Sequence, residues 1–252
     1  MKRAITAVLL MTALATGYDT CAEGIAAARP VLLPTPAFKG QIALAEIWVE
    51  PLDLRLESET PNAITDDADW FARNGLDRPE PGPQFELGGP RGELLFGLDS
   101  AGRVIFAFDF SNYALAPGWL PGDRDYVEQE LNWAAEKDAI LYVSHAHRTY
   151  AESSAGLNGY ITAIDIRSGT VIWRTEPLVC NSRNFLIRDD VIVCGYGFTA
   201  EPDFVHQLNR HTGETIARHP VRTAPEWLAE KGGRLFVRCY DTDYVFGLES
   251  GR

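Results

Sequence analysis

The chain is poor in several residue types on which particular functions depend. Its 252 residues include four cysteines and two methionines, and none of the cysteines has the Cys-x-x-Cys-His spacing of covalently bound haem. Lys and Arg total 23 against 35 Asp and Glu, which leaves a formal net charge of −12. An acidic balance disfavours nucleic acid, whose phosphates need a basic face, and also anionic membrane surfaces. We therefore expect neither as a partner.

Several motifs of catalytic chemistry are also missing. The sequence contains no Gly-x-Ser-x-Gly elbow, no phosphate loop and no His-Glu-x-x-His zinc motif. The glycine-rich stretch Gly88–Gly92 opens a strand rather than a helix, so a phosphate cradle is not expected there. Asp241-Thr242-Asp243 lacks the longer pattern of a calcium loop and indicates a hairpin tip. The motifs thus predict no catalytic residue and no metal site.

A long apolar run occurs only at the N-terminus. Met1-Lys2-Arg3 precedes Ala4–Ala15, which is apolar apart from two threonines, and small residues follow. This order is typical of a secretory signal peptide, which we place at residues 1–22, and the run is too short for a comfortable membrane span. A buried N-terminal helix is the alternative. A lipid attached to Cys21 fits less well, because Tyr18-Asp19-Thr20 precede that cysteine. We expect a periplasmic or secreted protein with no transmembrane segment.

An oxidising compartment changes what the cysteines can do, since free thiols tend to pair there. Cys180, Cys194 and Cys239 are possible disulfide cysteines, and Cys194 and Cys239 follow similar apolar strands. Four cysteines in all allow three connectivities, among which the sequence does not choose. The alternative is that these side chains are small buried hydrophobes.

The most informative feature of the chain is an internal sequence repeat. Each copy consists of a strand, an acidic or amide residue, a glycine turn and a second strand. An Asp or Asn side chain accepts from its own downstream backbone, and glycine supplies the positive φ that closes the hairpin. Spacings of roughly 40–50 residues are typical of propellers and related arrays. The copies are Phe96–Phe106, Thr162–Trp173, His206–Ala217 and the shorter Phe246–Gly251.

A second repeated segment precedes each hairpin. In it, a short strand is joined to an apolar strand by a turn that contains charged residues or glycine. Together they make four strands per unit, as in a propeller blade. We therefore predict an all-β fold, a small β-propeller of four to five four-stranded blades in residues 84–252. Residues 23–83 form a lead-in, in which Gln41–Leu56 completes the last blade, 58–83 is a surface loop and Asp66–Asn74 contains a short helical turn. An open ring, or a part of a larger one, is the alternative.

One copy carries a family resemblance. Gly159–Trp173 reads Gly-x-aliphatic-x-Ala-aliphatic-Asp-x-x-Ser-Gly-x-aliphatic-aliphatic-Trp and resembles the blade repeat of quinoprotein-type (PQQ-like) β-propellers. The resemblance implies that Trp173 packs between blades. Quinone sites in the dehydrogenases of this class use an adjacent-cysteine disulfide, a stacked Trp and Ca²⁺, and this chain has no adjacent cysteines. We therefore predict no cofactor, with pyrroloquinoline quinone and calcium as the alternative.

The function that we expect is a non-catalytic binding scaffold, which contacts a protein partner or small ligand on one rim. Function on a rigid β scaffold gathers on its loops, here Arg148–Asn158 and Thr199–Phe204. His145 and His147, two apart on a strand, could share a metal in a hydrolase, although two polar residues on a solvated blade edge or at a loop mouth are the simpler interpretation. A quinone-dependent oxidoreductase, or a fragment of one, is the other alternative. The candidate contact residues are His145, His147, Arg148, Tyr150, Tyr196 and Phe198.

Overall fold

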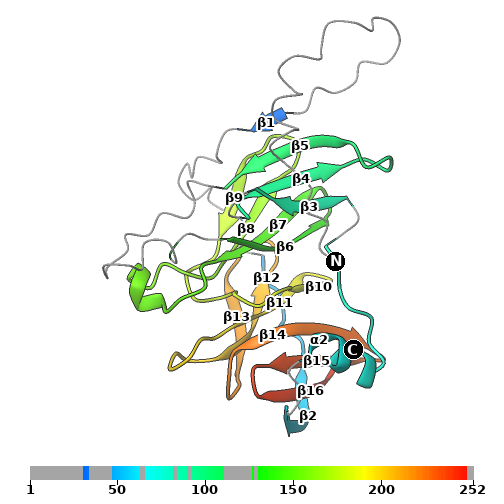
Figure 1. Ribbon diagram of the computed structural model, residues 1–252, viewed down its shortest axis with the longest axis vertical. Coiled ribbons are helices and arrows are strands. Elements are labelled where there is room, and N and C mark those ends of the chain that lie inside the picture. Colours follow the sequence, from blue (N-terminus) through cyan, green and yellow to red (C-terminus); the bar gives the residue numbers. More distant parts are fainter. Residues whose placement is uncertain are drawn as a thin grey trace, which may run out of the picture.

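The structure is a computed structural model that describes residues 47–62, 66–81, 84–89, 92–110, 127 and 130–248, together with the backbone of 31–33. The proposed signal peptide and Cys21 lie outside these residues. The described chain forms four four-stranded sheets, as the repeats predict. Figure 1 shows the sheets following one another along the long axis of the molecule. No helix within the described ranges is long and apolar enough to cross a membrane.

Each sheet follows the order of the chain, apart from one strand that residues 1–83 contribute to each of the end sheets. The first sheet is β1 (Val31–Leu33), β5 (Val104–Asp109), β4 (Leu94–Leu98) and β3 (Phe85–Gly88). The second is β6 (Glu130–Lys137), β7 (Ile140–Ala146), β8 (Tyr160–Asp165) and β9 (Val171–Arg174). The third is β10 (Leu186–Arg188), β11 (Val191–Tyr196), β12 (Phe204–Asn209) and β13 (Thr215–Pro220). The fourth is β14 (Pro225–Lys231), β15 (Arg234–Cys239), β16 (Thr242–Leu248) and β2 (Leu54–Pro61).

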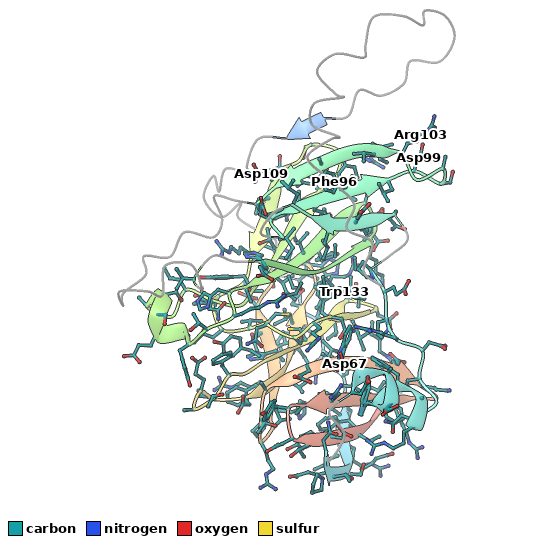
Figure 2. The ribbon with its side chains drawn as sticks, viewed as in Figure 1. Asp67, Phe96, Asp99, Arg103, Asp109 and Trp133 are labelled. Carbon is teal, nitrogen blue, oxygen red and sulfur yellow. The ribbon has the colours of Figure 1, made fainter. Side chains whose placement is uncertain are left out.

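The repeated hairpin turns have the predicted chemistry. Asp99 Oδ1 accepts from the backbone N–H groups of Ala101 and Arg103, both at 2.9 Å, at the hairpin tip labelled in Figure 2. Asp165 Oδ1 accepts in the same way from Arg167 and Ser168, at 2.8 and 2.9 Å. The glycines that follow these acids have positive φ, 75° in the first copy and 66° in the second. The last copy ends in residues 249–252, outside the described part.

The N-terminal part supplies the closing strand, but further along the chain than predicted. β2 pairs antiparallel with β16, from Leu54 opposite Leu248 to Pro61 opposite Thr242. The expected strand ended at Leu56, and the residues that follow were assigned to a loop. Only Leu54 of β2 is buried, so apolar residues do not mark the extent of this strand. A further correction is Val31–Leu33, which lies in the predicted lead-in and pairs in parallel with β5.

Successive sheets pack face to face through three apolar clusters. Leu141 and Val143 of β7 pack with Leu95 and Phe108 of the first sheet, while Tyr142, between them, belongs to the cluster shared with the third sheet. Side chains of a strand alternate between its two faces, so β7 is buried on both. Val191 and Val193 of β11 continue the pattern toward the fourth sheet. Each sheet is thus held mainly by its neighbours in the row.

The far face of the fourth sheet is covered by helix α2 (Asp67–Arg73), the helical turn predicted there. Phe71 meets Trp227 edge to face, with ring centroids 5.5 Å apart, and Arg238 forms an ion pair with Asp67. Figure 1 places the first and fourth sheets at opposite ends of the molecule. The described chain is therefore an open row of blade-like sheets with a capping helix, rather than a closed ring.

Candidate functional site

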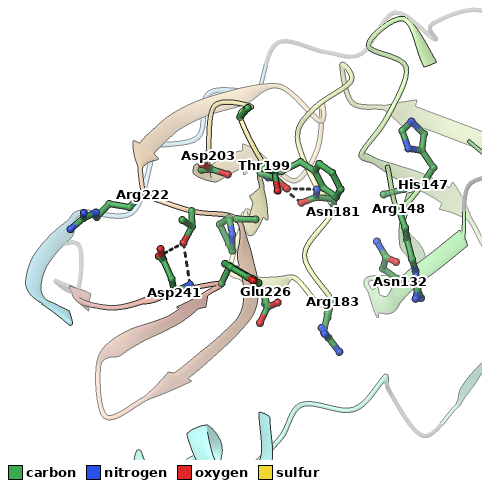
Figure 3. Close-up of a pocket in the computed structure, with 18 residues that line it drawn as sticks. Asn132, His147, Arg148, Asn181, Arg183, Thr199, Asp203, Arg222, Glu226 and Asp241 are labelled. Atoms are coloured by element: carbon green, nitrogen blue, oxygen red, sulfur yellow. Dashed lines mark hydrogen bonds between the residues drawn. The ribbon is translucent and has the colours of Figure 1, made fainter. Parts of the chain in front are cut away.

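A cleft of about 650 Å³ opens at one rim of the row, beside the second, third and fourth sheets (Figure 3). We call it the rim groove. It is built from the loops that join the second and third strands within a sheet and from those that lead to the next sheet. The residues that line it are Asn132, Ala146–Arg148, Asn181, Arg183, Gly197–Ala200, Asp203, Arg222–Glu226, Tyr240 and Asp241.

Side-chain amides hold these loops in place. Asn181 donates to Gly197 O at 2.6 Å and accepts from Gly197 N at 3.1 Å, so it pairs with the backbone as a strand residue would. Asn158 pairs with His147 in the same two-way manner, at 2.8 and 3.4 Å, and Asn184 pairs with Leu228 at 2.8 and 2.9 Å. Each amide forms hydrogen bonds with one backbone N–H and one backbone C=O that the strand ladders leave unpaired. The groove walls are therefore preorganised.

His145 does not reach the groove. It is only 1% exposed, Nε2 lies 3.0 Å from Thr162 Oγ1, and the ring stacks on Tyr160. Burial, followed by the charge of Arg174, lowers the pKa of His145. The interpretation of a solvated edge residue is wrong, because the end of β7 is covered on both sides.

His147 lines the groove, although it too is buried, at 2% exposed. Its Nδ1 accepts from Thr149 N at 3.4 Å, which places the proton on Nε2, 2.7 Å from Ser154 Oγ. That hydroxyl donates to Ala151 O at 3.1 Å. Burial lowers the pKa of His147 to about 4. The ring thus donates to Ser154 and has no lone pair left to remove its proton, so the pair is not arranged as a nucleophile and base.

The two predicted loops meet at the rim. Tyr150 packs edge to face on Phe198, with ring centroids 5.0 Å apart, and Phe198 lines the groove. Arg148 also lines it, exposed and paired with Glu130 at 2.6 Å. Tyr196 lies below the loops, where its hydroxyl donates to Glu201 Oε2 at 2.6 Å. Arg148, Tyr150 and Phe198 are therefore available to a partner, whereas Tyr196 supports them.

Sequence reasoning missed most of the groove. Arg183 and Arg222 stand at its edges, paired with acids on α2 and β2 at 3.4 and 3.6 Å. Tyr240, 72% exposed, follows β15, and Asp241 accepts from Thr223 Oγ1 at 2.8 Å. The position of these residues after a strand was the available signal. It was not used for Arg222, Tyr240 and Asp241 because their connections are short and length was taken as the mark of a binding loop. The longer connection 175–185, which holds Arg183, was not considered.

Asp203 is the most perturbed acid of the groove. Burial, with the neighbouring charges of Glu201 and Asp241, raises its pKa from 3.8 to about 6. The folded state then holds the proton up to a higher pH than the unfolded chain, so this group lowers stability progressively as the pH rises from about 4 to 6. It is the ionised carboxylate of Asp203 that destabilises the folded state.

We expect the Asp203→Asn substitution to raise the free energy of unfolding by about 1 kcal/mol at pH 7. This value is smaller than the pKa shift alone would give, because water in the groove screens the charge. The gain should vanish below pH 4, where the aspartate is protonated in both states. Urea unfolding at pH 4 and pH 7 measures this difference. An equal effect at both pH values would show that the charge of Asp203 is not its cause.

The cysteines divide into a pair and a single residue. Cys180, Cys194 and Cys239 are all free and buried in the structure. Cys180 and Cys194 share the core between the second and third sheets, whereas Cys239 belongs to the core of the third and fourth. No group of three His, Cys, Asp or Glu side chains within the described ranges is placed to hold a metal ion.

Comparisons with known proteins add little to this picture. No family model matches the chain. Among curated proteins, dopamine beta-hydroxylase of Rattus norvegicus is 24% identical over 134 residues, which cover 52% of this chain and 19% of that protein. The match spans about a fifth of the relative's length, and at this identity it does not show a family.

Solved structures show low similarity as well. BamB from Moraxella catarrhalis has a TM-score of 0.34 and 18% identity, covering 62% of this chain and 53% of its own. The computationally designed Ika4 protein has a TM-score of 0.42 and 12% identity, covering 67% and 88%. These scores are too low to support an argument. The fold class follows from the chain's own strand order: an all-β array of four propeller-like blades.

Proposed function

We propose that this chain is a non-catalytic binding scaffold of the periplasm or extracellular space, and that the rim groove is its contact surface. The observation that carries the proposal is the groove itself: about 650 Å³, open, and walled by loops that amide side chains fix. Preorganised loops reduce the entropy lost on binding. The N-terminal sequence, read as a signal peptide, supports the location.

The groove suits recognition better than bond chemistry. Exposed aromatic and arginine side chains surround it, and these residue types dominate the binding energy of protein interfaces. The imidazole of His147 and the hydroxyl of Ser154 meet at its wall. The imidazole carries its proton on Nε2 and donates it to Ser154, so it cannot act as a base toward that hydroxyl. A protein partner or a small ligand with both apolar and charged groups would fit these walls.

The test compares groove variants with matched variants elsewhere. Tyr240→Ala and Arg148→Ala remove exposed groove side chains, while Trp48→Ala and Arg103→Ala remove similarly exposed side chains outside it. The full chain is cross-linked to its partners in an extract of its native compartment, and the recovered partner is titrated against each variant. We expect the groove variants to weaken binding about tenfold or more, as hot-spot truncations do, and the controls to leave it unchanged.

Equal affinity for groove and control variants would overturn the assignment of the groove. A parallel titration with pyrroloquinoline quinone and Ca²⁺ separates the scaffold from the oxidoreductase alternative. Stoichiometric uptake with a spectral change would contradict a non-catalytic role.

A further inference from the structure

Two buried thiols lie side by side where the loop 175–185 passes β11. The Cys194 thiol donates to Val179 O at 3.5 Å, the carbonyl directly before Cys180. The backbone N–H groups of Asn181 and Ser182 both donate to Gly195 O, at 2.9 and 3.0 Å. The residues after Cys180 are thus bonded to the residue after Cys194, which keeps the two cysteines next to each other.

The side-chain environment agrees with this placement. Burial raises the Cys194 pKa, and the neighbouring Cys180 thiol adds to the shift. Ser182 Oγ, 3.8 Å from Cys180 Sγ, accepts from Gly195 N at 3.1 Å and so ties the loop to β11 a second time. Both thiols are fully buried. A disulfide requires two cysteines on neighbouring backbone segments, and these hydrogen bonds hold the loop of Cys180 against the strand of Cys194.

We infer that Cys180 and Cys194 are a disulfide-forming pair, and that Cys239 stays a free thiol. In the reaction, the thiolate of one cysteine attacks a small dialkyl disulfide and releases one small thiol. The second cysteine then displaces the other, which leaves the intramolecular bond. Together the two cysteines lose two electrons and two protons. The small disulfide takes up both electrons and both protons and becomes two small thiols. The link closes a short loop of the third sheet.

The link has a consequence for the groove, although it does not depend on the proposed function. Asn181 and Arg183, which line the groove, lie one and three residues after Cys180, and Gly197 and Phe198 lie three and four residues after Cys194. Bonding the two cysteines would therefore tie two of the segments that line the groove to each other. Because both thiols are buried and the Cys194 pKa is raised, oxidation needs opening of the loop or takes place during folding.

The experiment maps the cysteines of the full chain after refolding in a mixture of glutathione and glutathione disulfide. Remaining thiols are alkylated in denaturant, and the digest is analysed by mass spectrometry. We expect one linked peptide pair, Cys180 to Cys194, with Cys239 alkylated. The oxidised protein should melt about 5–10 °C above the reduced protein, as a loop of this length predicts.

Variants identify the pair independently of the mapping. Cys239→Ala should keep the redox-dependent melting shift, and Cys180→Ala and Cys194→Ala should both lose it. A refolded wild-type chain with all thiols alkylated would overturn the inference, as would any link that includes Cys239. The wild-type map decides the matter even where a variant does not fold, and it measures no binding.

Discussion

Replacing Trp173 with alanine should lower the free energy of unfolding by about 3–5 kcal/mol, the range of large-to-small changes in a core. Trp173 is 3% exposed and stands between the second and third sheets, where its indole N–H donates to Arg210 O at 3.2 Å. Its ring lies against the turn glycine Gly213. The resemblance to quinoprotein-type repeats implied only that Trp173 packs between blades. The substitution opens a cavity at the contact that joins two sheets, and urea unfolding followed by circular dichroism measures the loss.

Two control substitutions separate packing from other effects. Trp48 is 85% exposed, so Trp48→Ala should lower the free energy of unfolding by less than about 0.5 kcal/mol. A Cβ at Gly213 would lie 2.5 Å from the Trp173 ring, so Gly213→Ala should destabilise the wild type more than it destabilises the Trp173→Ala protein. Additive effects of the two substitutions, or a loss below 1 kcal/mol for Trp173→Ala, would contradict the proposed contact.

The parts of this fold that could be predicted are those whose physics is local. An aspartate that accepts from the next few backbone N–H groups, followed by a glycine with positive φ, makes a hairpin wherever it stands. The turns at Asp99 and Asp165 were therefore predictable, and with them the two strands that each turn joins. Trp173 was predictable for a related reason, since its position in the repeat recurs with the turn.

The remainder depends on contacts between distant residues, which no local pattern reports. The last sheet gains β2 from a segment more than 180 residues earlier in the chain, and the polar exposed face of β2 resembles a loop in sequence. Asn158 and Asn181 look like ordinary loop residues until their partners are known. His147 seemed solvated for the same reason: its cover, Ser154, arrives with a loop whose path the sequence does not reveal.

Replacing Arg238 with alanine should destabilise the protein by about 3 kcal/mol, the lower end of the range for breaking a buried ion pair. Arg238 is 3% exposed and forms an ion pair with Asp67 of α2, with Glu226 at 3.6 Å. The lower end applies because Asp67 keeps a second partner, Arg183 at 3.4 Å. α2 contacts the fourth sheet through this pair, through Phe71 and through the ion pair of Arg73 with Asp243 at 2.7 Å. Loss of the Arg238 pair removes one of these contacts and should loosen the helix, which hydrogen exchange of the α2 amides measures.

A double variant tests whether the charge pair or the packing matters. Arg238→Met together with Asp67→Leu removes both charges and keeps most of the apolar volume, and such exchanges are often neutral or stabilising. We therefore expect the double variant to be more stable than Arg238→Ala by at least about 2 kcal/mol and to retain slow exchange in α2. If it is as unstable as Arg238→Ala, the ion pair specifies the docking of α2 in a way that apolar contacts do not replace. If Arg238→Ala itself leaves stability and exchange unchanged, the ion pair of Arg238 with Asp67 does not hold α2 on the fourth sheet.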